Sequence, residues 1–168
     1  MSNCFTQACA AALLAFALLT SSTAPGAAES VKPAMSASGI IATKSAYGLQ
    51  DTVERLKKDI AAKGITFFQE IDQAALAAKS GIELRPSILL IFGNPPLGTQ
   101  FMTANPQAGL DWPVRLLVYR DASGAVWTAY TDFAWIAKRH GVQSRDAQFH
   151  MASEVAASIV SSVAAHRP

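Results

Sequence analysis

The sequence predicts an α+β domain in which helices pack on one face of an antiparallel β-sheet. Several short runs rich in apolar and β-branched residues have the length of strands, and the last two of them are joined by the four residues DASG, as in a hairpin. Two longer segments carry the apolar stripe of an amphipathic helix, one early and one at the end. The predicted order is β-α-β-β-β-β-α, with short helical insertions.

The first strand and the first long helix are expected within residues 39–64. The segment GIIATKS is rich in β-branched residues, which favour a strand. Gly64 then follows a helical segment, as a glycine at a helix end commonly does. The apolar stripe of this helix recurs at steps of four, three and four residues: Leu49, Val53, Leu56 and Ile60.

Two more strands and a short helix are expected between residues 65 and 93. ITFFQEI alternates, with Ile65, Phe67, Gln69 and Ile71 on one face, and we expect this strand to be antiparallel to the first or adjacent to it. DQAALAAKSG predicts a helix that begins after the cap Asp72 and ends at Gly81. SILLIFG is apolar throughout, which suits a central strand.

The last third of the chain predicts a hairpin and two helices. VRLLVYRD and AVWTAYT alternate, with Tyr130 and Trp127 on opposite faces, and Gly124 ends the turn between them. DFAWIAKRHG predicts a short helix capped by Asp132. The final helix carries an apolar stripe at steps of four with two alanines beside it: Met151, Val155, Ile159 and Val163, with Ala152 and Ala156.

The connection between the third and fourth strands, residues 94–113, holds four prolines and two glycines. Proline fixes its own φ and extends the residue before it, so we expect Asn94, Asn105 and Trp112 to be extended and the segment to be rigid. LGTQFMTANP has room for about two helical turns, with Thr99 as the cap and Phe101 and Met102 turned inward. Such a segment is either a ligand-facing wall or dimer contact, or a lid whose asparagines satisfy their own backbone.

Three motifs of the chain, IFGNP, ANPQAGLDWP and RHG in that order, resemble the bacterial family called domain of unknown function 302. The resemblance extends over nearly all of the expected domain. It implies a fold like that of the TATA-binding-protein class, in which helices pack on an antiparallel sheet, often as a homodimer. It implies no activity, and a fold shared with a DNA-binding protein does not indicate DNA binding.

The first 28 residues have the layout of a secretory signal peptide, with an apolar run too short to span a membrane and then small residues. We expect cleavage after Ala28, or alternatively after Ala24, a leader over residues 29–38 and one domain over 39–168. Since no Lys or Arg precedes the apolar run, an uncleaved anchor is the alternative. The expected compartment is the periplasm, with no stable membrane insertion after cleavage. Cys4 and Cys9 would be removed, which leaves no thiol for disulfides or metals.

The charge and the remaining motifs exclude several classes of function. The 14 Lys and Arg against 12 Asp and Glu are scattered, so a nucleic acid partner is not expected. No G-x-S-x-G, P-loop or dinucleotide motif occurs. His140, His150 and His166 lack the spacing of a metal site, and we predict no metal and no cofactor.

The chemistry that remains centres on a few residues near the proline-rich segment. His140 could donate a proton or bind a metal or haem, or it could cap its helix. Our leading hypothesis is a homodimeric, non-enzymatic domain that binds a small molecule or a protein, with a site lined by Asn94, Asn105, Asp111, Tyr130 and His140. One alternative is a hydrolytic or redox enzyme that uses His140 with Asp111 or Asp132. Another is a structural protein that assembles through a homodimer.

Overall fold

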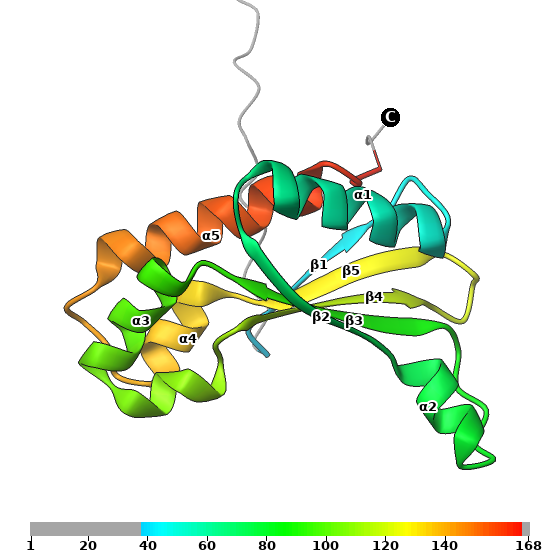
Figure 1. Ribbon diagram of the computed structural model, residues 1–168, viewed down its shortest axis with the longest axis horizontal. Helices are drawn as coiled ribbons and strands as arrows, with labels where there is room; N and C mark the ends of the chain where they lie inside the picture. The colour runs from blue at the N-terminus through cyan, green and yellow to red at the C-terminus, as the bar shows by residue number, and fades with distance from the viewer. Residues whose placement is uncertain (1–37, 166–168) are drawn as a thin grey trace, which may run out of the picture. The chain divides into compact units, whose positions relative to one another are not determined.

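The computed structural model describes residues 38–165, so the expected signal peptide and all but Ser38 of the expected leader lie outside the described residues. One five-stranded antiparallel sheet has the strand order β1-β5-β4-β3-β2 (Figure 1). The strands are β1 (Ile40–Lys44), β2 (Thr66–Asp72), β3 (Ser87–Gly93), β4 (Val114–Arg120) and β5 (Val126–Thr131). The predicted α+β class is confirmed. The expected pairing of β1 with β2 is wrong, because these two strands form opposite edges of the sheet.

Two long helices lie on one face of the sheet, α1 (Leu49–Ala62) and α5 (Asp146–Ser161), and Figure 1 shows both above the strands. The shorter elements are α2 (Gln73–Lys79), α3 (Pro95–Ala104), the 3-10 helix η1 (Pro106–Leu110) and α4 (Phe133–Arg139). Asp72 and Asp132 cap α2 and α4 through their carboxylates, as predicted. Within residues 38–165 no helix has the length and apolar character needed to cross a membrane.

The core lies between the sheet and the two long helices. The sheet contributes alternate residues of its inner strands, among them Leu90, Leu116 and Val118, all fully buried or nearly so. The expected stripe of α1 is confirmed, since Val53, Leu56 and Ile60 are completely buried. Burial of this apolar surface is the main source of stability for the domain.

The expected stripe of α5 is only partly correct. Met151 is 53% exposed, whereas Ala152, Ala156 and Ile159 are buried. A strict step of four residues advances about 40° beyond a full turn of an α-helix each time, so such a stripe winds away from the core. The small alanines take the inward positions instead.

Strand β2 is irregular at Phe68. Phe67 pairs with Phe92 while Gln69 pairs with Ile91, so the register shifts between them. Paired residues share a face, and Phe67 therefore points to the helices while Gln69 points to the other side. The predicted single face for Phe67 and Gln69 is thus wrong, because an extra residue interrupts the alternation.

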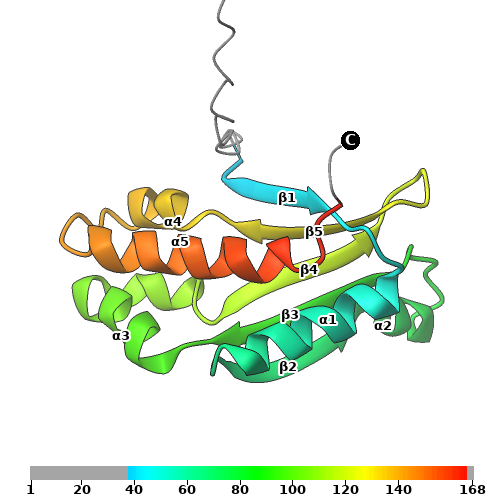
Figure 2. The ribbon, with the colours of Figure 1, turned by 90° about the horizontal axis from the view of Figure 1, so that it is seen from above.

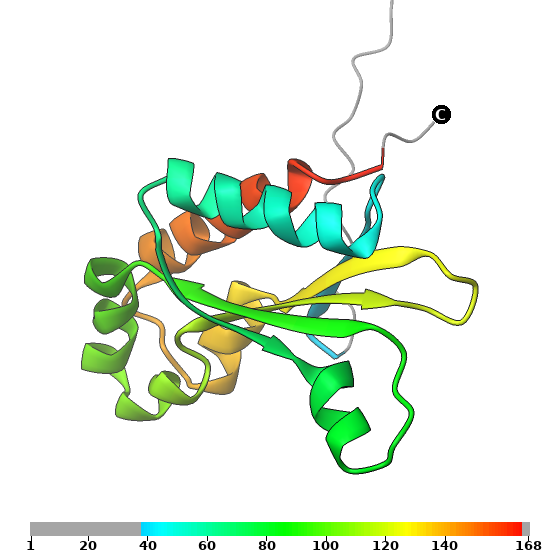
Figure 3. The same cartoon turned by 45° about the vertical axis from the view of Figure 1, so that its right-hand side comes forward.

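The opposite face of the sheet carries no long helix. Figures 1 and 3 show its middle bare between α4 at one end and α2 at the other. Successive side chains of a strand point to opposite faces of the sheet, and the strand register shows which ones point to this face. Those of the three inner strands are partly exposed and mostly apolar. We call this face the open face: Leu89, Ile91, Leu117, Tyr119, Trp127 and Ala129.

Candidate functional site

The proline-rich segment is folded into two helical elements rather than a loop. The side-chain oxygen of Asn94 accepts a hydrogen bond from the Leu97 amide at 3.2 Å, and Pro95 and Pro96 open α3. Proline suits the first turn of a helix because it has no N–H to leave unpaired there. The cap is therefore Asn94 and not the predicted Thr99. The extended backbone expected at Asn94 and Asn105 is confirmed.

The ring of Trp112 packs directly against two glycines, Gly93 at the end of β3 and Gly98 in α3. A Cβ on Gly98 would lie 1.9 Å from the indole Nε1, and one on Gly93 would lie 3.0 Å from the ring. Phe68 contacts the same ring edge-on, at 5.9 Å between centroids. Glycine at these positions thus lets α3 lie close to the sheet.

A groove of about 500 Å³ runs along α3 and α5, near the end of α1. Figure 2 shows α3 and the carboxyl end of α1 along the same side of α5. We call this groove the α3–α5 groove. It is lined by Lys63, Ile65, Asn94, Leu97, Met151, Glu154, Val155 and Ser158. A smaller apolar cavity of about 40 Å³ shares Ile65, Leu97 and Val155 with the groove and reaches Trp112.

The groove has an apolar floor and charged or polar groups at its margins. Ile65, Leu97 and Val155 are half-buried and form the apolar part. Lys63 forms an ion pair with Asp59 at 2.6 Å, and Glu154 lies 3.6 Å from His150. Ligand sites typically combine an apolar lining with a few placed polar groups in this volume range. Of the predicted site residues only Asn94 lines this groove.

Three other predicted residues meet in a second place, around the buried carboxylate of Asp111. The Asp111 side chain is 3% exposed and that of His140 is 5% exposed, with 2.6 Å between Oδ2 and Nε2. Asn105 donates its side-chain N–H to the backbone oxygen of His140 at 2.8 Å. The contacts join η1 to the end of α4, so residues 29 positions apart form one unit.

Two arginines complete this unit, which we call the Asp111 cluster: Asp111, Arg115, Arg139 and His140. Arg115 donates to Oδ1 of Asp111 at 3.1 Å, and Arg139 donates to Oδ1 and Oδ2 at 3.3 and 3.2 Å. A buried carboxylate is costly unless it is paired and hydrogen-bonded, and here cationic donors surround it. An ionised carboxylate only accepts hydrogen bonds, so Nε2 of His140 is the donor toward it.

The Asp111 cluster leaves little room for a substrate. The recess beside it, which Arg115 and Thr131 also line, has a volume of about 10 Å³. This is about the space of one water molecule. The Asp–His pair that the enzyme hypothesis requires is thus present, but the recess is too small for an organic substrate. Asp132 does not join it, because its carboxylate caps α4 at 3.0 Å from the Ala134 amide.

Tyr130 lies apart from both places. It is buried on the sheet face that α1 and α5 cover, and burial together with the nearby Asp132 charge raises the pKa of its phenol to about 12. It lines neither the α3–α5 groove nor the recess. Within residues 38–165 no group of three His, Cys, Asp or Glu side chains is arranged to hold a metal ion.

The sequence-based reasoning missed Arg115, Arg139 and the apolar groove residues. Two local signals were available for the arginines: Arg139 directly precedes His140, and Arg115 follows Asp111 by four residues. No local signal pairs Leu97 with Val155, because the two residues meet only through the packing of α3 near α5.

Comparisons with known proteins agree with this fold. The model of the family described as "Domain of unknown function DUF302" matches residues 41–165. The crystal structure of an uncharacterized conserved DUF302 protein from Bacillus stearothermophilus superimposes with a TM-score of 0.69 at 15% identity, over 74% of this chain and 98% of that one. At this identity the likeness establishes the fold alone.

Similar curated sequences come from three Brucella species. The chain is 38% identical over 105 residues to a protein named fluoride-specific ion channel FluC 1 of Brucella suis, covering 62% of this chain and 41% of that protein. The FluC 1 of Brucella abortus and the FluC 2 of Brucella melitensis match at the same identity, over 39% of their length. The chain therefore spans about two fifths of the length of these curated relatives.

Proposed function

The chain belongs to the DUF302 family of domains of unknown function, and from this premise we propose that it is a binding domain that takes up a small molecule in the α3–α5 groove. The observation that carries the proposal is the groove itself, about 500 Å³ with a floor of Ile65, Leu97 and Val155. Pockets of about 300 to 1,000 Å³ are typical for small organic ligands. An apolar molecule with one polar end fits this lining best.

Several features support a rigid groove. The wall formed by α3 begins at two prolines and a capped turn, and Trp112 wedges it against the sheet. At its other end η1 is tied to α4 through the Asp111 cluster. A preformed wall loses little conformational entropy when a ligand binds, which favours affinity.

The enzyme alternative is supported by the Asp111–His140 pair, whose atoms lie 2.6 Å apart. A general base must reach the proton that it removes from a bound substrate. The pair is buried, the neighbouring recess holds about 10 Å³, and both oxygens of Asp111 already accept hydrogen bonds from arginines. These features favour a structural role for the pair, and so they favour binding over catalysis.

The first experiment is native mass spectrometry of the protein purified from its own host. A retained mass of one small molecule per chain is the expected result, and its identity would name the ligand. In parallel, the dye N-phenyl-1-naphthylamine, which fluoresces in apolar sites, reports occupancy of the groove.

A matched pair of variants tests the location. Ser158→Trp fills the groove from α5, whereas Ala157→Trp places the same side chain at an exposed position outside the lining. We expect dye binding to fall at least tenfold in Ser158→Trp and to stay unchanged in Ala157→Trp. Equal binding by the two variants would refute the groove as the site.

The compartment and the oligomeric state are further parts of the proposal. We propose that the chain is exported to the periplasm after cleavage behind residue 28 and that it forms a homodimer. The same spectrum tests the cleavage and the homodimer, because it gives the mass of the chain and the number of subunits. A full-length monomer would contradict both parts.

A further inference from the structure

The open face and the Asp111 cluster meet where β4 begins. Arg115 is the second residue of β4, and alternation places its side chain on the same face as Leu117. Ile91 lies directly opposite Arg115 in the strand ladder. An arginine therefore stands at the border between the apolar part of this face and the cluster.

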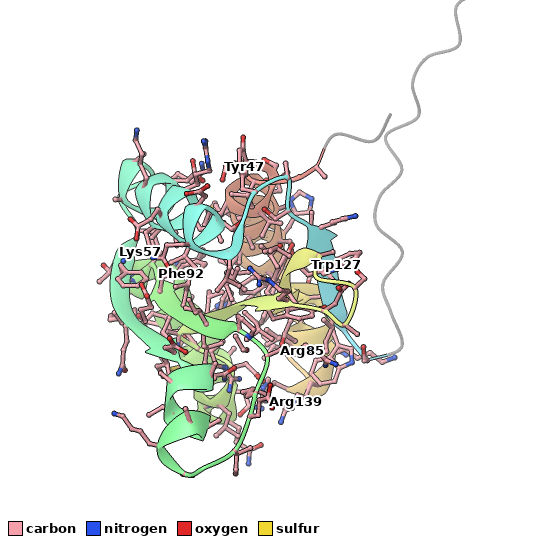
Figure 4. The ribbon with its side chains drawn as sticks, turned by 90° about the vertical axis from the view of Figure 1, so that its right-hand side faces the viewer. Tyr47, Lys57, Arg85, Phe92, Trp127 and Arg139 are labelled. Atoms are coloured by element: carbon pink, nitrogen blue, oxygen red, sulfur yellow. The ribbon has the colours of Figure 1, made fainter. Side chains whose placement is uncertain are left out.

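The charged side chains that the strands place on this side of the sheet are positive, whereas the carboxylate of Asp121, which accepts a hydrogen bond from Trp127 at 2.8 Å, lies beyond the far end of β4 from Arg115. Among the described strand residues that point to this side, Lys44 and Arg115 are cationic and none is acidic. Arg139 joins them from α4, and Figure 4 shows it together with Arg85 on the side of the sheet away from α1. Two copies packed through this face would bring like charges together, whereas an anion is complementary to it.

The two arginines keep unused donors. Their side chains are 51% and 45% exposed, and their hydrogen bonds in the described part of the chain engage only Nη2 of Arg115 and Nη1 of Arg139. Each guanidinium has five N–H donors. The single carboxylate of Asp111 balances only one of the two cations, and its side chain is 97% buried. A net positive charge thus remains at the surface of the cluster.

We propose that Arg115 and Arg139 bind the carboxylate of a small organic anion whose apolar body lies on the open face along Ile91 and Leu117. A guanidinium matches a carboxylate in plane and spacing, which gives strong charge-assisted hydrogen bonds. Asp111 holds both guanidiniums in place before the ligand arrives, so little side-chain entropy is lost on binding. This site is separate from the α3–α5 groove and does not depend on it.

The size of the apolar body follows from the strand geometry. From Arg115 to Tyr119 the chain advances about 13 Å at about 3.3 Å per residue. An eight-carbon chain is about 10 Å long when extended and fits between these positions. Octanoate is therefore a suitable probe.

The test titrates the protein with octanoate, acetate and octylammonium while NMR records the arginine Nε–H and backbone amide signals. We expect octanoate to shift the signals of Arg115, Arg139 and Leu117 and to bind at least tenfold more tightly than acetate, which lacks the apolar body. Octylammonium carries the opposite charge and is expected to leave these signals in place. Equal shifts with octanoate and octylammonium would overturn the proposal.

Two kinds of variant complete the test. Arg115→Gln and Arg139→Gln are each expected to weaken octanoate binding at least tenfold, while Arg120→Gln, an exposed arginine on the same strand outside the cluster, is expected to bind like the parent. Unchanged binding in both cluster variants would refute the site. Far-UV circular dichroism and thermal melting establish that each variant is folded.

The groove variant Ser158→Trp separates this proposal from the proposed function. If octanoate still shifts Arg115 in Ser158→Trp, the open-face site is independent of the groove, as proposed. If the shift at Arg115 disappears in that variant, octanoate occupies the groove and the open-face proposal fails. Dye binding in the groove is measured separately, so either idea can fail without the other.

Discussion

Replacing Gly98 by alanine tests how tightly α3 lies against the sheet. Gly98 is buried within α3, where glycine costs about 1 kcal/mol relative to alanine from helix propensity alone. Propensity therefore predicts that Gly98→Ala stabilises the protein. The packing predicts the opposite sign, because the new Cβ would lie 1.9 Å from Nε1 and 2.2 Å from Cε2 of Trp112.

The magnitude follows from how far the ring can move. Carbon atoms pack at about 3.5–4.0 Å, so relief requires a shift of more than 1 Å. The ring has little room to slide toward β3, because it already lies so close to the Gly93 backbone that a Cβ added there would be 3.0 Å from it. Overpacking of this kind costs typically 1–3 kcal/mol, and occasionally more. A contact of 1.9 Å belongs to the upper part of this range, about 2–3 kcal/mol, so after the helix-propensity gain of about 1 kcal/mol we expect a net destabilisation of about 1–2 kcal/mol.

The assay is urea denaturation followed by far-UV circular dichroism, with a double-mutant cycle through Trp112→Leu. Once the indole is removed, Gly98→Ala is expected to stabilise the protein by up to about 1 kcal/mol, since only the propensity term remains. A reversal of sign between the two backgrounds is the expected signature. A neutral or stabilising Gly98→Ala in the parent would refute the tight contact between α3 and Trp112.

Three further predictions concern buried polar groups. Asp111→Asn is expected to lower the free energy of unfolding by about 1.5–3 kcal/mol, because it removes charge-assisted hydrogen bonds from Arg115, Arg139 and His140. Urea denaturation measures this free energy, and an unchanged value would contradict the structural role of the cluster. Thr52→Val keeps the side-chain shape but loses the 2.8 Å hydrogen bond to the Gly48 oxygen, and we expect a loss of about 1 kcal/mol in the same assay. In a spectrophotometric titration, we expect the parent protein to show a phenol ionisation with a midpoint near pH 12, and we expect this ionisation to be absent from Tyr130→Phe. Because this pKa is raised, the folded state retains its proton when the unfolded state loses it, and stability falls as the pH rises above 10.

Local signals in the sequence predicted the elements whose ends depend on nearby residues. Asp72 and Asp132 cap their helices as expected, and Gly64, Gly81 and Gly124 have the positive φ that the expected helix ends and turn require. These features depend on hydrogen bonds and backbone angles within a few residues. Reasoning from short stretches is sufficient for them.

The features that were predicted wrongly depend on contacts between distant segments. The register shift in β2 is set by the pairing of Phe67 and Gln69 with β3, and nothing within ITFFQEI indicates an extra residue. Of the predicted stripe of α5, Ile159 and Val163 are buried as predicted, but Met151 is exposed, because close packing against the neighbouring elements places the small Ala152 and Ala156 inward. The positions of β1 and β2 at opposite edges also follow from strand pairings across the whole sheet.

In the candidate site, too, the sequence indicated part of the arrangement, and contacts between distant segments determined the rest. Asp111 and His140 were expected to act together in one alternative, and they do lie in contact. Their chemical meaning changes, however, once Arg115 and Arg139 are included, because a carboxylate surrounded by cationic donors is already satisfied. Residue types near a strand end can indicate a cluster, but only its burial and its remaining donors show which atoms could meet a ligand.

Prolines, asparagines and a glycine explain how residues 94–113 fold. Pro95 and Pro96 begin α3 behind the Asn94 cap, Pro106 begins η1 behind Asn105, and Gly98 admits the Trp112 ring. The segment is thus a wall that is fixed at its start by the cap, in the middle by the indole and at its end by Asp111. One side of this wall faces the α3–α5 groove, and Asp111 near its end orients two arginines beside the open face, so loosening the wall should affect both proposed sites. Gly98→Ala, which strains the middle of the wall, is therefore expected to weaken dye binding in the groove more than octanoate binding at Arg115, whereas Asp111→Asn should show the reverse order.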